Sequence, residues 1–275
     1  MKKKISIFVI GLLFLLSSCY IENKKPQENN PFHPIIYRES WMYLDGADWT
    51  DNLKHSNYGL VIAGSQNGVF MKIDEFKYNG YSINELRKND TLDYIAQVET
   101  ELVFPGNIFD IYNQNNKAGS IVCNHIEYSR RNPDEGADHL NMYFDKMPLV
   151  SSGKIIGICC DWNPMPRQAN IYDDSIEVDI NGNGIIDKIS WKIENNSNES
   201  FLIISAIYNN HEYHFRKQGE YSIRNVSLIS VMDLNGDGTL ELLFSQTDIG
   251  SYVNIYQIND KGIEEVINYV IYSGP

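Results

Sequence analysis

Two nine-residue segments, 54 positions apart, share one pattern of acidic, amide and glycine residues. Residues 179–187 read DINGNGIID, and residues 233–241 read DLNGDGTLE. Both segments carry an oxygen-bearing side chain at positions one, three, five and nine, and both have glycine at position six. A hard cation such as Ca²⁺ takes about six to eight oxygen ligands, and glycine at position six allows the sharp turn that folds them inward. The repeat therefore predicts two calcium-binding loops, called the first and the second loop below.

Five positions of each loop are candidate calcium ligands, and position seven contributes its main-chain carbonyl. These residues are Asp179, Asn181, Asn183, Ile185 and Asp187 in the first loop, and Asp233, Asn235, Asp237, Thr239 and Glu241 in the second. The second loop has three carboxylates and the first has two, so we expect the second to bind Ca²⁺ more tightly. Extracellular sites of this kind bind at about 10⁻⁴ to 10⁻³ M, which favours a structural ion over a sensor. The alternative is a pair of turns that bind no ion, because Asn, Asp and Gly dominate turns for local reasons.

The residues after each loop predict strands and favour a β-hairpin loop over an EF-hand. Ile189, Trp191 and Ile193 alternate with polar residues, which is the period of a strand. An EF-hand needs a bidentate carboxylate at position twelve and a helix that leaves the loop. Position twelve is Ser190 in one loop and Phe244 in the other. Each loop is therefore expected to join two β-strands.

The C-terminal part of the chain repeats one layout of strands. The pattern predicts strands at 185–194, 201–208 and 211–216, and then at 226–232, 240–245, 252–258 and 263–270. Asn209-Asn210 predicts a two-residue hairpin turn, and residues 259–262 predict a second turn. Residues 170–275 thus form two copies of strand, cation loop, strand, strand, turn, strand.

These two units resemble the calcium-bearing blades of the FG-GAP and VCBS repeat families, which are related to integrin-type β-propellers. The resemblance covers about residues 170–270 and rests on the loop pattern and the surrounding strands. It implies ligands at the loop positions given above, and a binding or adhesion scaffold more often than a catalyst. The Phe-Gly and Gly-Ala-Pro signatures of those families are missing, position five of the first loop is Asn183, and two copies do not close a propeller.

The N-terminal half also predicts strands, at 58–63, 69–78, 92–104, 108–112, 120–128 and 140–144, with a turn at 64–68 and a helical turn at 83–88. We expect an all-β fold of antiparallel, blade-like sheets in a partial or irregular β-propeller, with a β-sandwich as the alternative. Residues 32–165 would form an N-terminal β-rich region and residues 166–275 the two calcium-loop units, with a boundary near 164–168 or one continuous domain across it.

The N-terminus resembles a bacterial lipoprotein signal peptide. Three lysines at 2–4 precede an apolar run from Ile5 to Leu16, and Leu16-Ser-Ser-Cys19 resembles a lipobox. The apolar run is too short to span a bilayer, as is usual for a cleaved secretory signal. We expect residues 1–18 to be the signal peptide, Cys19 to carry lipid, and residues 19–31 to be a tether. The expected location is the cell envelope, anchored in a membrane and facing the periplasm or the exterior.

The charge of the chain argues against nucleic acid as a partner. The formal net charge is −13, and removal of the first 18 residues, with three lysines and no acidic residue, would make it −16. Phosphate backbones and anionic lipid surfaces repel such a chain. Bound calcium would offset part of this charge, and the acidity also serves solubility.

Cysteine and histidine residues offer weaker candidates for metal sites. Cys123 and His125 share one face of a predicted strand, so a thiolate and imidazole metal site with Cys159 or Cys160 is one interpretation. One disulfide from Cys123 to either Cys159 or Cys160 is another. Buried, inert thiols are the third, which the apolar surroundings favour. His211 and His214 lack the helical spacing of a zinc motif, since on a strand they point to opposite faces.

No catalytic motif is evident in the sequence. There is no Gly-x-Ser-x-Gly elbow, phosphate-binding glycine loop or dinucleotide fingerprint. Trp41, Trp49 and Trp162 are candidates for stacking on sugar rings, although tryptophan is more often in a core. We therefore expect a non-catalytic binding or adhesion module with a glycan or protein ligand. An envelope enzyme acting on polysaccharide and a structural envelope subunit are the two alternatives.

Overall fold

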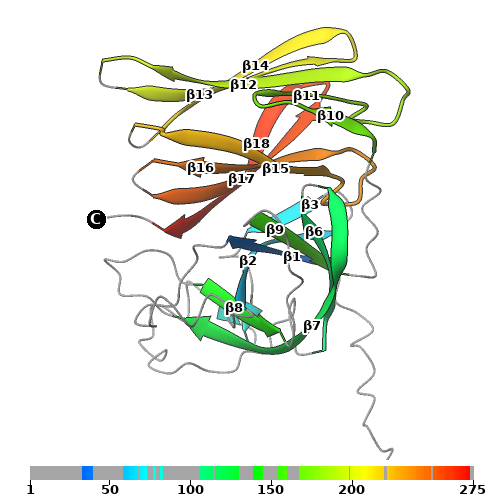
Figure 1. Cartoon of the computed structure of the whole chain (residues 1–275), viewed down its shortest axis with the longest axis vertical. Helices are drawn as coiled ribbons and strands as arrows, with labels where there is room; N and C mark the ends of the chain where they lie inside the picture. Colours follow the sequence, from blue (N-terminus) through cyan, green and yellow to red (C-terminus); the bar gives the residue numbers. More distant parts are fainter. Residues whose placement is uncertain are drawn as a thin grey trace, which may run out of the picture. The chain divides into compact units, whose positions relative to one another are not determined.

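The computed structural model describes residues 33–39, 58–66, 69–72, 77–78, 81–82, 106–113, 115–129, 139–144, 154–159, 167–197, 199–219, 222–248 and 250–272. These residues form antiparallel strands and turns, with no helix among them (Figure 1). The all-β prediction is confirmed. Residues 31–275 cluster as one compact unit. The predicted signal peptide, Cys19 and tether lie outside the described residues.

The N-terminal strands form one seven-stranded sheet, called the N-terminal sheet, in the order β1-β9-β6-β7-β8-β2-β3. The strands are β1 (His33–Glu39), β2 (Tyr58–Gln66), β3 (Val69–Lys72), β6 (Ile108–Asn113), β7 (Asn116–Ser129), β8 (His139–Phe144) and β9 (Lys154–Cys159). Because β1 also pairs with β2, the strand pairings form a closed circuit that runs from β1 through β9, β6, β7, β8 and β2 and back to β1. Two short strands, β4 (Lys77–Tyr78) and β5 (Tyr81–Ser82), pair separately.

The first loop lies in a five-stranded sheet, called the loop-1 sheet, whose strands follow chain order. They are β10 (Ala169–Ile171), β11 (Ser175–Val178), β12 (Asp187–Asn195), β13 (Ser200–Tyr208) and β14 (His211–Gln218). The predicted hairpin turn at Asn209-Asn210 is confirmed. Both residues have positive φ, 50° and 63°, which asparagine tolerates and which a twisted two-residue hairpin requires.

The second loop lies in a four-stranded sheet, called the loop-2 sheet, which also follows chain order. Its strands are β15 (Asn225–Met232), β16 (Glu241–Thr247), β17 (Ser251–Asn259) and β18 (Gly262–Tyr272). Each strand was predicted to within a few residues. Gly262 has a φ of 134°, which suits the glycine at the end of the predicted turn.

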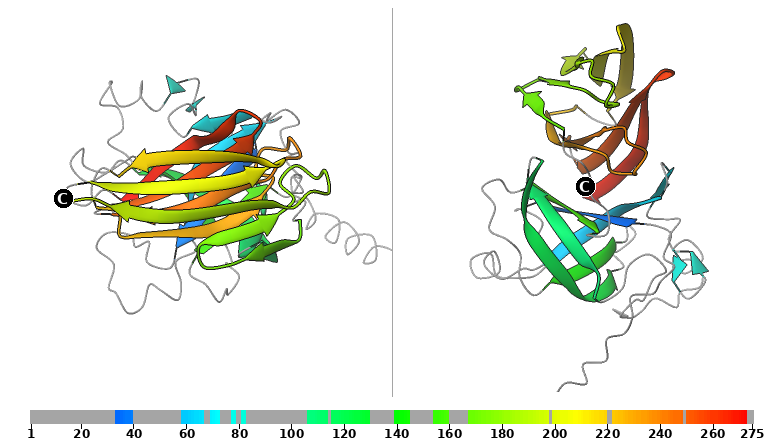
Figure 2. Two further views of the ribbon diagram at one scale, coloured as in Figure 1. Left: turned by 90° about the horizontal axis from the view of Figure 1, so that it is seen from above. Right: turned by 90° about the vertical axis from the view of Figure 1, so that its right-hand side faces the viewer.

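The two loop sheets pack face to face through a shared hydrophobic core (Figure 2). Trp191 of the loop-1 sheet contacts Phe244 of the loop-2 sheet edge-on, with ring centroids 5.0 Å apart. Phe244 contacts Tyr256 at 5.8 Å, and Tyr256 contacts Phe215 of the loop-1 sheet at 5.3 Å. Edge-on aromatic pairs contribute about 0.5–1.5 kcal/mol each beyond the buried area.

The opposite face of the loop-2 sheet belongs to a second hydrophobic cluster. This cluster joins Leu243, Val253, Ile255 and Ile267 to residues of β1, β2, β6 and β9, including Tyr37 and Ile62. Consequently β16 and β17 are buried on both faces, and Glu241 to Gln246 are all buried. A strand covered on both sides loses the alternation of polar and apolar residues that a half-exposed strand shows.

The N-terminal predictions were less accurate. β2 continues to Gln66, where a turn was predicted from residue 64, because residues 63–66 pair with β3 and residues 60–65 with β1. β3 ends at Lys72, earlier than predicted. Strands β1 and β9 were not predicted, although they pair with each other. The strand expected at 92–104 and the helical turn at 83–88 lie outside the described residues.

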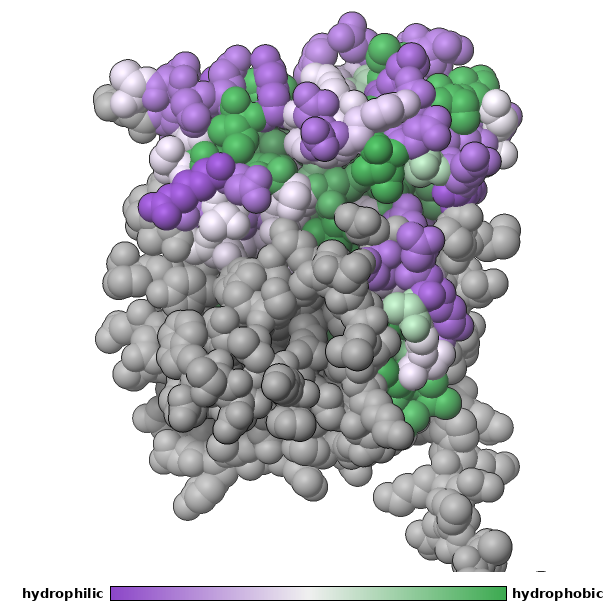
Figure 3. Space-filling view, viewed as in Figure 1, coloured by the Kyte–Doolittle hydropathy of each residue, from purple (hydrophilic) through white to green (hydrophobic). Residues whose placement is uncertain are grey.

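On the face shown in Figure 3, the described C-terminal surface is mainly hydrophilic, with small separated hydrophobic areas. Exposed apolar residues in this part are Ile171, Tyr172, Ile185, Ile186 and Ile207. Ion pairs lie on the loop-1 sheet, including Lys188 with Glu177 at 3.1 Å. Isolated apolar residues on a polar surface are normal for a folded domain.

Candidate metal centre

Each candidate loop connects two neighbouring strands of its sheet. The first loop joins β11 to β12, and the second joins β15 to β16. Glycines at positions four and six have positive φ in both loops: Gly182 at 74° and Gly184 at 86°, and Gly236 at 82° and Gly238 at 84°. Most residues other than glycine are strained when φ is positive. The two loops therefore share a backbone path as well as a sequence pattern.

The two loops also share a set of side-chain hydrogen bonds, position by position. The carboxylate at position one accepts from the main-chain NH of position six, the amide oxygen at position three accepts from position five, and the side chain at position five accepts from position seven. The donor–acceptor distances are 2.8, 3.2 and 2.8 Å in the first loop and 3.0, 3.0 and 2.7 Å in the second. These bonds turn the polar side chains toward the inside of each loop.

The carboxylate at position nine is buried in both loops, because it begins a core strand. Asp187 is 1% exposed and Glu241 is 0% exposed. Each accepts a hydrogen bond from the main-chain NH at position two, at 3.0 Å from Ile180 and 2.6 Å from Leu234. The other carboxylate oxygen of Asp187 accepts a hydrogen bond from the main-chain NH of Asn209 at 3.0 Å, and that of Glu241 accepts one from Nε2 of Gln257 at 3.1 Å.

The second loop concentrates negative charge in a desolvated place. Burial raises the pKa of Glu241 well above its ordinary value. The hydrogen bonds from Leu234 and Gln257 lower this pKa, whereas the charges of Asp237 and Asp233 raise it further. Burial also raises the pKa of Asp233, although the amides of Gly236 and Gly238 oppose this. A cation beside these groups would favour their ionised forms.

The donor chemistry of both loops fits a hard cation. Within the described part of the chain, no three His, Cys, Asp or Glu side chains are grouped as ligands of a metal ion. In both loops the carboxylates accept hydrogen bonds from main-chain amides. Amide oxygens and main-chain carbonyls complete the oxygen-only set that Ca²⁺ takes, and each carboxylate oxygen has further lone pairs.

The two loops lie next to each other. The main-chain NH of Leu240 donates to the carbonyl oxygen of Ile180 at 2.9 Å. Arg167, which precedes β10, donates from Nη1 to the carbonyl oxygens of Asp179 (3.0 Å) and Ile180, and from Nη2 to that of Gly238 (2.6 Å). Sequence reasoning missed this role for Arg167, because its partners are main-chain atoms 12, 13 and 71 residues away.

The cysteine and histidine candidates do not form a described metal site. Cys123 is a buried thiol on β7, and burial raises its pKa to about 12. Cys159 ends β9, and β6 lies between β7 and β9 in the sheet. His211 and His214 are exposed on β14. His214 lies 3.0 Å from Ser205 Oγ and 3.4 Å from a Glu212 oxygen. Cys160, Trp41, Trp49 and Trp162 lie outside the described residues.

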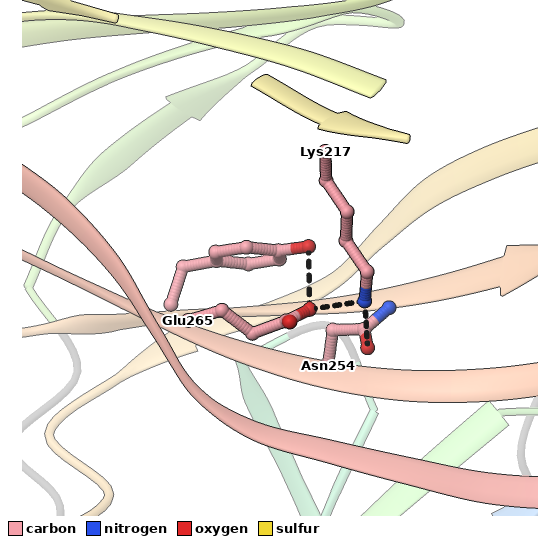
Figure 4. Close-up of polar contacts among 4 residues, drawn as sticks. Lys217, Asn254 and Glu265 are labelled. Atoms are coloured by element: carbon pink, nitrogen blue, oxygen red, sulfur yellow. Dashed lines mark hydrogen bonds and ion pairs between the residues drawn. The ribbon is translucent and has the colours of Figure 1, made fainter. Parts of the chain in front are cut away.

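A separate polar cluster links the two loop sheets (Figure 4). Lys217 on β14 reaches Glu265 on β18 at 2.5 Å and Asn254 Oδ1 on β17 at 3.4 Å. The Tyr256 hydroxyl donates to the same Glu265 oxygen at 3.0 Å. Burial is the main cause that raises the pKa of Tyr256, and the charge of Glu265 raises it further. The hydroxyl therefore stays protonated and remains a hydrogen-bond donor. This cluster is an inter-sheet contact.

Comparison with known proteins gave no match: no family model matches the chain, and no curated protein or solved structure matches it. Among the described residues, there is no helix with the length and apolar character needed to cross a membrane.

Proposed function

We propose that this protein is a lipid-anchored, non-catalytic binding or adhesion module of the cell envelope, and that two structural calcium ions stabilise its C-terminal sheets. The observation that carries the proposal is the equivalence of the two loops. They share sequence pattern, positive-φ glycines and side-chain hydrogen bonds at the same positions. Two turns that serve only local stability would not need to agree in these features along a nine-residue segment.

Calcium would be held by the side-chain oxygens at positions one, three, five and nine and the main-chain carbonyl at position seven. These are Asp179, Asn181, Asn183, Ile185 and Asp187 in one loop, and Asp233, Asn235, Asp237, Thr239 and Glu241 in the other. The ion would supply positive charge beside two carboxylates, Asp233 and Glu241, whose pKa burial raises. Its role would be to fix the connections β11–β12 and β15–β16. The outside of the cell, where calcium is plentiful, suits such sites.

The proposed architecture is two consecutive blades of the FG-GAP or VCBS type attached to a different N-terminal sheet. The in-order strands of both loop sheets and their face-to-face packing support the blade interpretation. The N-terminal sheet has another strand order and its own circuit of pairings. We therefore favour a partial propeller over a complete ring, with a β-sandwich of the two loop sheets as the alternative description.

The sequence supports the proposed anchoring and ligand class. Several acyl chains on Cys19 would hold the protein at a membrane, since each buried methylene contributes about 0.8 kcal/mol. The formal charge of −13 favours glycan or protein ligands over nucleic acid. Glycan-array binding measured with calcium and with chelator would test the ligand class. Calcium-dependent binding supports the module, and absence of binding in both conditions favours a structural subunit.

Calcium stoichiometry tests the site itself. Isothermal titration of the full chain should give two Ca²⁺ per chain, the tighter one in the second loop. Asp179→Ala and Asp233→Ala should each remove one site. Asp173→Ala is the matched control, because Asp173 is an exposed carboxylate outside both loops. Titration without any saturable binding contradicts the proposal, as does loss of one site in the control variant.

A further inference from the structure

Arg167 is placed between the two loops and belongs to neither of them. Its guanidinium donates to carbonyl oxygens at positions one and two of the first loop, Asp179 and Ile180, and at position six of the second, Gly238. Arginine suits this task because its planar group presents several donors in a fixed geometry. A lysine ammonium is a compact charge on a flexible stem, and it does not reproduce this fork.

Two further contacts show that the loops and the guanidinium form one packed unit. A Cβ atom placed on Gly182 would lie 2.7 Å from Arg167 Nη2, so glycine at position four leaves room for the arginine. The Leu240 NH donates to the Ile180 carbonyl at 2.9 Å, which joins the loops directly. Ile180 therefore accepts hydrogen bonds from both Arg167 and the second loop.

We propose that Arg167 couples the two loops, so that Ca²⁺ bound in one loop strengthens Ca²⁺ binding in the other. This inference rests on the proposed calcium function. The three hydrogen bonds of Arg167 form together only when both loops have the described conformation. An ion that orders one loop also orders the Arg167 guanidinium. The other loop is then partly ordered before its own ion binds, so that binding costs less conformational entropy. Coupling of this kind is reciprocal between the two sites.

The positive charge of Arg167 has an effect that is separate from coupling. A guanidinium near a cation site weakens cation binding by repulsion, whatever the state of the other loop. Removal of the charge therefore changes the affinity of each loop, but it does not make one loop depend on the other. An arginine with only a structural or electrostatic role would not make the calcium affinity of one loop depend on whether the other loop is intact.

The test is a calcium titration of the second loop with the first loop intact and with the first loop disrupted by Asp179→Ala, in the full chain. With Arg167 present, disruption should raise the dissociation constant of the second loop by about fivefold or more, the lower end of usual coupling. With Arg167→Gln or Arg167→Lys, the same disruption should change it by less than about twofold. The reverse experiment, with Asp233→Ala and the first loop titrated, should give the same factor.

Arg216→Gln is the matched control, since this cation lies over the Phe201 ring of the loop-1 sheet and pairs with Glu194. It should keep the full coupling. Equal factors with and without the Arg167 side chain, or no dependence in the natural chain, would overturn the coupling while leaving two calcium sites in place. Absence of calcium binding in the natural chain would instead overturn the proposed function. Arg167→Lys keeps the charge, which makes the comparison valid even where Arg167→Gln does not fold.

Discussion

The main-chain NH of Leu240 donates a hydrogen bond of 2.9 Å to the carbonyl oxygen of Ile180, and this bond joins position eight of the second loop to position two of the first. Leu240 is 1% exposed within the core of the two loop sheets. The equivalent residue of the first loop, Ile186, is 55% exposed. The preceding unit thus covers position eight of the second loop, and no described residue covers that of the first to the same extent.

This asymmetry predicts different costs for the same change in the two loops. Leu240→Ala should lower the free energy of unfolding by about 2–5 kcal/mol, the usual cost of a large-to-small change in a core. Ile186→Ala should cost less than about 1 kcal/mol, because the side chain is half in solvent. Urea unfolding in chelator would measure both without a contribution from calcium. Equal costs would show that the loops are not stacked in this way.

Glu241 predicts how the calcium-free protein responds to pH. Its pKa is raised in the folded chain from an ordinary value of 4.5, so the folded state holds a proton that the unfolded state releases. In chelator, stability should therefore fall as the pH rises from about 4.5 toward the raised pKa. Calcium favours the ionised form and should remove this fall.

The control for this pH dependence is Glu241→Gln, which cannot ionise. Unfolding free energies in chelator between about pH 4.5 and 8 should show a smaller fall for this variant than for the natural chain. Identical pH profiles for the two proteins would mean that Glu241 does not titrate as its burial requires. Groups that do not interact with Glu241 contribute equally to both profiles, so the difference reports Glu241 together with its charged neighbours Asp233 and Asp237.

The contact of Lys217 with Glu265 predicts a cost for separating the two loop sheets. Both side chains are 20% exposed. Lys217→Met should lower the free energy of unfolding by about 1–3 kcal/mol, because among the described residues it leaves the largely buried Glu265 carboxylate with only the Tyr256 hydroxyl as a donor. The double variant Lys217→Met with Glu265→Gln should recover part of this loss. A double-mutant cycle in urea would measure the pair, and strictly additive costs would refute the contact.

Burial of Cys123 predicts an unreactive thiol. With a pKa of about 12, only about one in 10⁴ of the Cys123 side chains is thiolate at pH 8, and the thiolate is the reactive form. Iodoacetamide at this pH should leave Cys123 unmodified in the native chain and modify it in urea. Mass spectrometry of the peptides would separate it from the other cysteines. Rapid labelling of the native chain would contradict the burial.

The loops, their connecting strands and the Asn209-Asn210 turn could be predicted because their signals are local. Period-two alternation, positive-φ residues and ligand spacing all lie within about ten residues. β1 could not be predicted in the same way, since its partner β9 is distant in the sequence and β1 has no turn that fixes its register to that partner. The position of Arg167 is also non-local, because its hydrogen bonds go to carbonyl oxygens that every residue possesses.

Burial on both faces also limited the prediction of the loop-2 sheet. Gln246 and Asn254 are 3% and 0% exposed, although amide residues at these positions suggest a solvent-facing side. The strands that contain them were predicted, but the covering of both faces was not. That arrangement depends on the core shared with the N-terminal sheet.

Thermal unfolding of the full chain in about 10 mM Ca²⁺ and in excess chelator is the most direct test of calcium stabilisation. With dissociation constants of about 10⁻⁴ to 10⁻³ M, each ion should add about 1.4–2.7 kcal/mol. At about 2–4 °C per kcal/mol for a chain of this size, the two ions together should raise Tm by about 6 °C or more. Asp179→Ala combined with Asp233→Ala should abolish the shift. The same Tm in calcium and in chelator would contradict the account.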